Sequence, residues 1–141
     1  EVLVAEAPLA GLDGAAAAFV TAALMAAIEG RRALVSASRL DAASAEGALA
    51  RSADHLVVLG GGEVAVEGPP GELFEAARVV SLTVHGDVEA LRGALSAQGI
   101  ELRGGPVRFA ASLPSDATPR QILLAAAATR AAVVEMVPVL G

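Results

Sequence analysis

The chain has 141 residues, of which 55% are hydrophobic, and carries a net charge of −6. It contains no cysteine, which excludes disulfides and thiolate metal sites and agrees with a reducing compartment, and its length fits one domain or two small ones. The ten basic residues are all arginines and form no cluster, and only three aromatic residues (all Phe) are present, so the surface needed to bind nucleic acid is missing.

The first predicted element is a strand over residues 2–5. Four apolar residues run directly into Glu6, a pattern typical of a strand that is buried on both faces in a parallel sheet. A carboxylate at the carboxyl end of such a strand lies where open α/β sheets hold their ligands. Because the chain begins within this strand and without a Met, we expect it to be a piece of a longer protein.

An alanine-rich helix is predicted over residues 14–28, with Asp13 as its N-cap and Gly30 just beyond its end. The apolar run is interrupted by Thr21 and is shorter than the roughly 20 residues that span a bilayer. No signal-peptide pattern is visible in the sequence. We expect one face of this helix to pack on a sheet, namely Phe19, Val20, Leu24 and Ile28.

A second buried strand is predicted over residues 32–37, followed by an alanine-rich helix over 40–53 that Ser38 is placed to cap. Residues 53–59 and 64–68 then form a hairpin around Gly60–Gly62. These glycines are not a phosphate loop, because no Gly-Lys-Ser/Thr follows and their flanks pair with each other. A short helix starts at Pro69–Pro70, where a missing N–H does no harm.

A change of composition near Arg78 marks a second unit, so we predict domains over 1–78 and 79–141. Strands are expected over 79–85, 100–103, 106–113 and 132–140, with helices over 88–98 and from Ser115 or Thr118 to 130. The order βαββαβ is the ferredoxin-like arrangement, with two helices on one face of an antiparallel sheet. The two histidines, His55 and His85, are far apart in sequence, and a lone histidine is more often structural than a metal ligand.

Residues 1–13 resemble the Walker B strand and D-loop of ABC-transporter ATP-binding subunits, usually four apolar residues followed by Asp-Glu-Pro-Thr-Ala-Gly-Leu-Asp. Glu6 stands at the Walker B Asp, which orients Mg²⁺ through water, and Ala7 stands at the catalytic Glu, which polarises the attacking water. Glu6 can still serve a metal shell, whereas Ala7 cannot accept a proton. An alternative alignment with a one-residue insertion puts Glu6 at the position of the catalytic Glu. Ala5 then stands at the position of the metal-binding Asp, so one carboxylate is missing in either alignment. The outright matches are Pro8, Ala10, Gly11, Leu12 and Asp13.

Residues 33–41 resemble the family's H-loop strand, with Ser38 in place of the histidine that contacts the γ-phosphate. The hairpin and the Gly-Pro-Pro that follows it also resemble the end of the family's ATPase core. The segment 79–141 is similar to the small C-terminal domain of many bacterial exporter subunits. The resemblance therefore implies the C-terminal part of a P-loop-type parallel sheet with a β-hairpin, followed by a ferredoxin-like domain.

The resemblance implies a degenerate ATP site without catalytic residues, in which Glu6 and Asp13 approach ATP and Glu6 approaches Mg²⁺. The chain has no Gly-x-x-x-x-Gly-Lys-Ser/Thr loop and no Leu-Ser-Gly-Gly-Gln signature, so cofactor binding requires residues upstream. We expect a regulatory or partner subunit that dimerises with an ATP-binding subunit and contacts a membrane permease, on the cytoplasmic side of the membrane. Two alternatives stay open, which are an interaction module without nucleotide and an ATPase active only through a partner's composite site.

Overall fold

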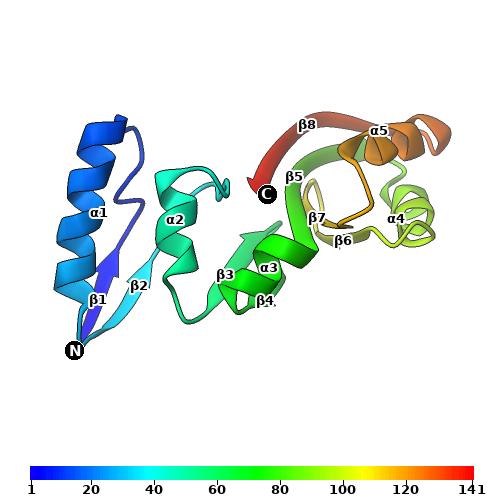
Figure 1. Cartoon of the computed structure of the whole chain (residues 1–141). Coiled ribbons are helices and arrows are strands. Elements are labelled where there is room, and N and C mark those ends of the chain that lie inside the picture. The colour runs from blue at the N-terminus through cyan, green and yellow to red at the C-terminus, as the bar shows by residue number, and fades with distance from the viewer. The chain divides into compact units, whose positions relative to one another are not determined.

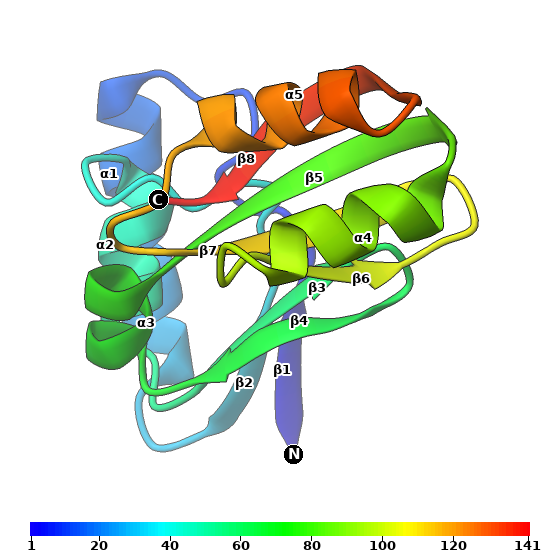
Figure 2. The same cartoon turned by 90° about the vertical axis from the view of Figure 1, so that its right-hand side faces the viewer.

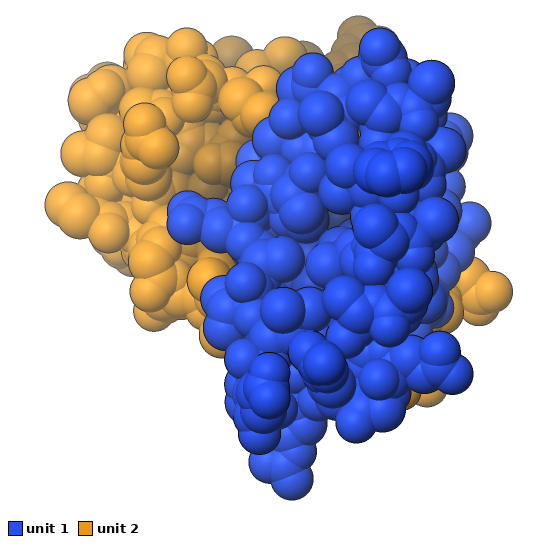
Figure 3. All heavy atoms as spheres, turned by 90° about the vertical axis from the view of Figure 1, so that its left-hand side faces the viewer, with its two compact units in different colours: residues 1–52 blue, residues 53–141 orange.

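The computed structural model describes residues 1–141, and the chain has a mixed α/β fold with two compact units, Glu1–Ser52 and Ala53–Gly141 (Figures 1 and 3). No helix combines the length and the apolar character needed to cross a membrane. Each unit has its own sheet or sheets, and each is described separately below.

The first unit consists of β1 (Val2–Ala5), α1 (Gly14–Ile28), β2 (Arg32–Val35) and α2 (Ala45–Arg51). β1 and β2 pair in parallel, as predicted, from Val2 opposite Arg32 to Ala5 opposite Val35. The prediction that the first strand is buried on both faces is wrong for this chain. One face of the two-stranded sheet is exposed, because no element of the unit covers Val2 (56% exposed), Val4 (67%) and Leu34 (65%).

Helix α1 has the predicted bounds, since Asp13 accepts a hydrogen bond from the Ala16 N–H at 2.8 Å and Gly30 follows the C-cap with φ +73°. Its predicted packing face is only partly correct. Phe19 is 76% exposed. The less exposed residues instead follow one another at intervals of three and four positions, as on one side of a helix. They are Ala17, Val20, Leu24 and Ile28, and Phe19 lies outside this face.

Helix α2 is shorter than the predicted helix over 40–53, because a turn occupies its first residues. The Asp41 side chain accepts from the Ala43 N–H at 2.9 Å, and the Asp41 carbonyl accepts from the Ser44 N–H at 3.0 Å. Ser44 is the N-cap, with its Oγ accepting from the Gly47 N–H at 3.0 Å. The prediction that Ser38 caps this helix is therefore wrong.

The second unit begins with the predicted hairpin, β3 (Leu56–Gly60) and β4 (Glu63–Gly68), which pair antiparallel with a bulge after Val58. Gly61 and Gly62 form the turn with φ +61° and +82°, a conformation that favours glycine. Helix α3 (Pro70–Ala76) follows and carries its proline at the first turn, as expected.

The rest of this unit is β5 (Ala77–Gly86), α4 (Val88–Ser96), β6 (Glu101–Gly104), β7 (Arg108–Pro114), α5 (Pro119–Ala128) and β8 (Ala131–Leu140). The strands form one antiparallel sheet in the order β6-β7-β5-β8, and Figure 2 shows α4 and α5 running over the same face of it. The core between the helices and the sheet is wholly apolar, and its largest fully buried members include Leu82, Leu91, Phe109 and Ile122.

Along the chain, the first compact unit ends at Ser52, whereas the sequence predicts a domain boundary after Arg78. The difference arises because the hairpin packs against the four-stranded sheet. β3 and β4 both contact β7, and β4 also contacts β6. Arg78 itself belongs to β5, and its guanidinium donates a hydrogen bond to the Ala117 carbonyl. The predicted boundary thus falls inside a compact unit. The division into domains over 1–78 and 79–141 stays a hypothesis that follows from the resemblance.

Candidate functional site

The carboxyl ends of β1 and β2 meet at one edge of the parallel pair, and this edge is the candidate site. Their pairing is extended by a hydrogen bond from the Ser36 N–H to the Ala5 carbonyl at 3.0 Å. Parallel pairing in register places Glu6 and Ser36 one residue beyond the last paired level on neighbouring strands. The edge at which parallel strands end is where open α/β sheets bind their ligands.

A second hydrogen bond closes this edge, because the Ala7 N–H donates to the Ser36 Oγ at 3.0 Å. Ala7 has φ +43°, in the left-handed region that residues with a Cβ rarely adopt. Its carbonyl accepts from the Ala10 N–H at 3.2 Å, so both backbone groups of the strained residue are engaged. The loop is anchored by Leu9, which is 5% exposed. Ser36 thus positions the backbone at residue 7.

The Glu6 side chain is exposed and makes no hydrogen bond or ion pair within the chain. No group of three or more His, Asp or Glu side chains is placed to hold a metal ion. A single free carboxylate does not hold Mg²⁺ by itself, since this ion normally keeps several waters and shares its shell with phosphates. Glu6 can therefore serve Mg²⁺ only together with groups supplied by a nucleotide.

Asp13 lies at the start of α1, and its Oδ1 is engaged by the Ala16 N–H. The predicted capping role is thereby confirmed. No hydrogen bond joins Asp13 to Glu6, Ala7 or Ser38 within the chain. Of the predicted site residues, Glu6 and Ala7 share the edge of the sheet, whereas Asp13 follows after a loop whose turn includes Gly11 at φ +72°.

Ser38 lines an open hollow of about 270 Å³ beyond the end of β2. The remaining lining residues are Arg39, Asp41, Ser44 and Glu46. Two of them are already engaged in starting α2, since the Ser44 Oγ donates to the Asp41 carbonyl at 2.7 Å and accepts from Gly47. Glu6 and Ala7 do not line this cavity. Ser38 therefore lines a hollow whose walls do not include Glu6 or Ala7.

Sequence reasoning missed Ser36, which is the side chain that joins the two strand ends. The sequence signal for Ser36 is a polar residue directly after the apolar run Ala33–Val35. In the structure, the pairing of Ala5 with Val35 puts this residue beside the loop that follows β1. The predicted strand over 32–37 places residue 36 inside the strand and not at its end. Only the register between the two strands shows that its hydroxyl faces the N–H of Ala7.

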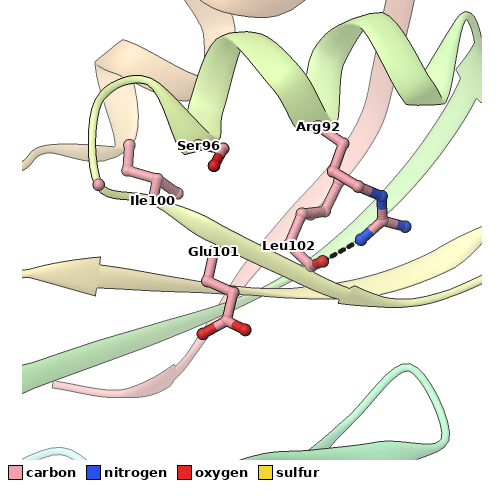
Figure 4. Close-up of a pocket in the computed structure, with 6 residues that line it drawn as sticks. Arg92, Ser96, Ile100, Glu101 and Leu102 are labelled. Carbon is pink, nitrogen blue, oxygen red and sulfur yellow. Dashed lines mark hydrogen bonds between the residues drawn. The ribbon is translucent and has the colours of Figure 1, made fainter.

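A second open hollow, of about 400 Å³, lies between α4 and β6. Figure 4 shows Arg92 reaching from α4 to the Leu102 carbonyl, while the Glu101 carboxylate points to the other side of the strand. The guanidinium also lies 5.8 Å from the centroid of the Phe109 ring and 3.6 Å from a Glu89 oxygen. Arg92 thus occupies the free edge of β6 and is engaged by the protein itself.

The histidines lie in the second unit. The His55 Nε2 is 3.3 Å from the Glu67 Oε2 across the hairpin, and both side chains are exposed. His85 lies near the end of β5, opposite Ala132. Neither histidine belongs to a group of three or more His, Asp or Glu side chains that could hold a metal ion.

Comparison of the sequence with models of protein families and with curated proteins finds no match. The function is therefore inferred from the geometry of the β1–β2 edge and from the motifs that resemble ATP-binding subunits. Two features of that edge carry the inference, namely the parallel register and the Ala7–Ser36 hydrogen bond.

Proposed function

We propose that this chain is part of an ATP-binding subunit of an ABC-type transporter that has lost its hydrolytic side chains, and that it acts as a regulatory or partner subunit. The observation that supports this most directly is the hydrogen bond between Ala7 and Ser36 at the edge where β1 and β2 end. This bond ties together the two segments that resemble the Walker B strand and the H-loop strand.

The chemistry left at this edge is too limited for hydrolysis. Ala7 offers no group that orients a water molecule or accepts its proton, and Ser38 has no imidazole. Glu6 retains a free carboxylate that can join the water shell of Mg²⁺. The β- and γ-phosphates of ATP need a backbone cradle and a Lys, and no such loop occurs in these 141 residues. In this proposal ATP binding depends on further polypeptide, and cleavage of ATP does not occur at this edge.

The exposed apolar face of β1–β2 agrees with a place inside a larger parallel sheet. Val2, Val4 and Leu34 lie on one face of the pair and are all more than half exposed. Parallel strands are normally covered on both faces. We infer that further elements of a nucleotide-binding sheet cover this face in the assembled transporter.

For the second unit we infer a ferredoxin-like domain of the kind that follows the ATPase core in bacterial exporter subunits. Three observations support this inference. The elements from β5 to β8 follow the order βαββαβ, the strands lie in the order β6-β7-β5-β8, and both helices cover one face of the sheet. The proposed partners are a second ATP-binding subunit and a membrane permease, which place the chain at the cytoplasmic face of the membrane.

An interaction module without nucleotide is the second candidate. It is favoured by the lining of the hollow at Ser38, which includes neither Glu6 nor Ala7, because a working site would gather these positions around one ligand. In that case the β1–β2 unit serves as a scaffold and its apolar face as a contact surface. The two candidates differ in whether Mg²⁺–ATP binds at all.

The test uses the native protein purified from its own cells, with its partner subunits. We expect it to bind a fluorescent ATP analogue in Mg²⁺ and to release phosphate only at the background rate. The double variant Ala7→Glu/Ser38→His should raise phosphate release, while Ala7→Glu/Ser38→Ala should stay at background. Turnover in the unmodified protein that depends on Glu6 and is lost in Glu6→Gln would refute the proposal. Absence of nucleotide binding would support the interaction module.

A further inference from the structure

We propose that the β3–β4 hairpin is clamped onto the four-stranded sheet by direct contact of its turn with β6 and β7, so that hairpin and sheet move and open as one body. The resemblance assigns the hairpin to the end of an ATPase core, whereas the contacts assign it to the sheet that follows. The proposal rests on packing within Ala53–Gly141 and does not depend on nucleotide binding.

The first contact joins Gly60 at the end of β3 to Ala110 in the middle of β7. A Cβ placed on Gly60 would lie only 2.3 Å from the Cβ of Ala110, a separation at which one of the two must shift. Ala110 is 1% exposed, so its methyl group has little room to move away. The backbone of Gly60 is not in the left-handed region, so the missing side chain is required by the neighbour and not by the turn.

The second contact is between two backbones. A Cβ on Gly104, the last residue of β6, would lie 2.6 Å from the Gly61 carbonyl oxygen. A Cβ on Gly61 would lie 2.7 Å from the Arg108 carbonyl oxygen and 3.0 Å from that of Arg103. Gly62, the next residue of the same turn, has open space around its Cα. The close approach is thus confined to the part of the turn that faces the sheet.

The burial of the hairpin agrees with these contacts. Val58 and Ala65 are 4% and 6% exposed, whereas Val57, Leu59 and Val64 are each more than 40% exposed. One side of the hairpin is therefore covered and the other is open. Since both hairpin strands contact β7, the covered side is the one turned toward the sheet. A hairpin held in this way is a rigid arm of the sheet and not a loose connector.

A double-mutant cycle in the full chain tests the clamp, with hydrogen–deuterium exchange of the β3 and β4 amides as the measurement. Gly60→Ala should speed exchange in these amides about tenfold or more, because its methyl group collides with Ala110. Ala110→Gly removes that collision, so the double variant Gly60→Ala/Ala110→Gly should exchange more slowly than Gly60→Ala alone. Gly71→Ala, in α3 with open space around it, is the matched control and should leave the hairpin unchanged.

Additive effects of the two substitutions would overturn the proposal, as would hairpin amides that exchange much faster than those of β5 and β7 in the unmodified chain. If Gly60→Ala does not fold, Gly61→Ala and Gly62→Ala give the same comparison. Both positions have a positive φ and share the backbone strain, but only Gly61 touches the sheet. A faster hairpin exchange in Gly61→Ala than in Gly62→Ala supports the clamp, and equal rates overturn it.

Discussion

Removing the hairpin from the C-terminal unit should lower its stability without abolishing its fold. We compare the fragments 53–141 and 79–141. Both should fold, because every residue of the main apolar core lies between Val80 and Ala126. The shorter fragment loses β3, β4 and α3, together with the first two residues of β5. The difference between the two fragments therefore measures how much the hairpin contributes.

The magnitude follows from the buried groups that the shorter fragment lacks. Burying Val58 contributes about 2 kcal/mol and burying the Ala65 methyl group about 0.8 kcal/mol. The hydrogen bond from the Arg78 guanidinium to the Ala117 carbonyl contributes about 1 kcal/mol more. Ordering residues 53–78 costs conformational entropy, which the hydrogen bonds and packing within the hairpin and α3 offset, so the groups named above set the scale of the coupling to the sheet. We expect the free energy of unfolding of 79–141 to be lower than that of 53–141 by about 2–4 kcal/mol.

Urea unfolding followed by far-ultraviolet circular dichroism measures both free energies. The longer fragment should unfold in a single transition with the larger m value, since it exposes more surface on unfolding. Equal free energies in the two fragments would refute the reasoning, because the hairpin would then add nothing to the sheet. Two separate transitions in 53–141 would refute it as well, because they would show a hairpin that melts by itself.

Five further substitutions test the packing and the site by urea or thermal unfolding. Phe109→Ala should lower the free energy of unfolding by about 3–5 kcal/mol, because its ring is 1% exposed, whereas Leu124→Ala, at 58% exposure, should change it by less than about 0.5 kcal/mol. Gly47→Ala should destabilise α2 although Ala has the better helix propensity, because the new Cβ would lie 2.0 Å from the Asp41 carbonyl oxygen. Gly93→Ala in α4, where a Cβ meets open space, should raise the free energy of unfolding by up to about 1 kcal/mol. Ser36→Ala should cost the first unit about 0.5–1.5 kcal/mol, because it removes the hydrogen bond that the Ala7 N–H donates, and no measurable loss would contradict its positioning role.

Local signals predicted most of the elements because short-range chemistry determines where they begin and end. Asp13 and Gly30 bound α1, and Asp87 starts α4 by accepting from the Ala90 N–H at 3.1 Å. Thr118 starts α5, with its N–H donating to the Gln121 Oε1 at 2.7 Å. Each of these contacts joins residues only a few positions apart, so the sequence contains the whole signal.

The misplaced features depend on contacts between distant residues. The early start predicted for the helix after β2 ignored the Asp41 turn, and Gly47 packs directly beneath that turn. From the sequence, Gly60–Gly62 indicate only a turn. In the structure, Gly60 and Gly61 also pack closely against residues 103–110, which leave no space for a Cβ. Nothing in the order of the sequence shows which strands lie beside each other. The packing of the hairpin on the four-stranded sheet and the role of Ser36 are hidden for that reason.

The conformation of Ala7 bears on what position 7 contributes to the proposed site. A residue with a Cβ in the left-handed region costs about 1–2 kcal/mol, and glycine would avoid this cost. Two hydrogen bonds hold the residue there, one to the Ser36 Oγ and one from the Ala10 N–H. A loop needed only to connect β1 to α1 gains nothing from alanine at this point. Under the proposed function, the same Cα stands at the position where active ATP-binding subunits carry the catalytic Glu. Glu is unbranched at Cβ and bears a backbone cost similar to that of Ala, so Ala7→Glu should fold as well as the parent and can test the chemistry of the site without disturbing its frame.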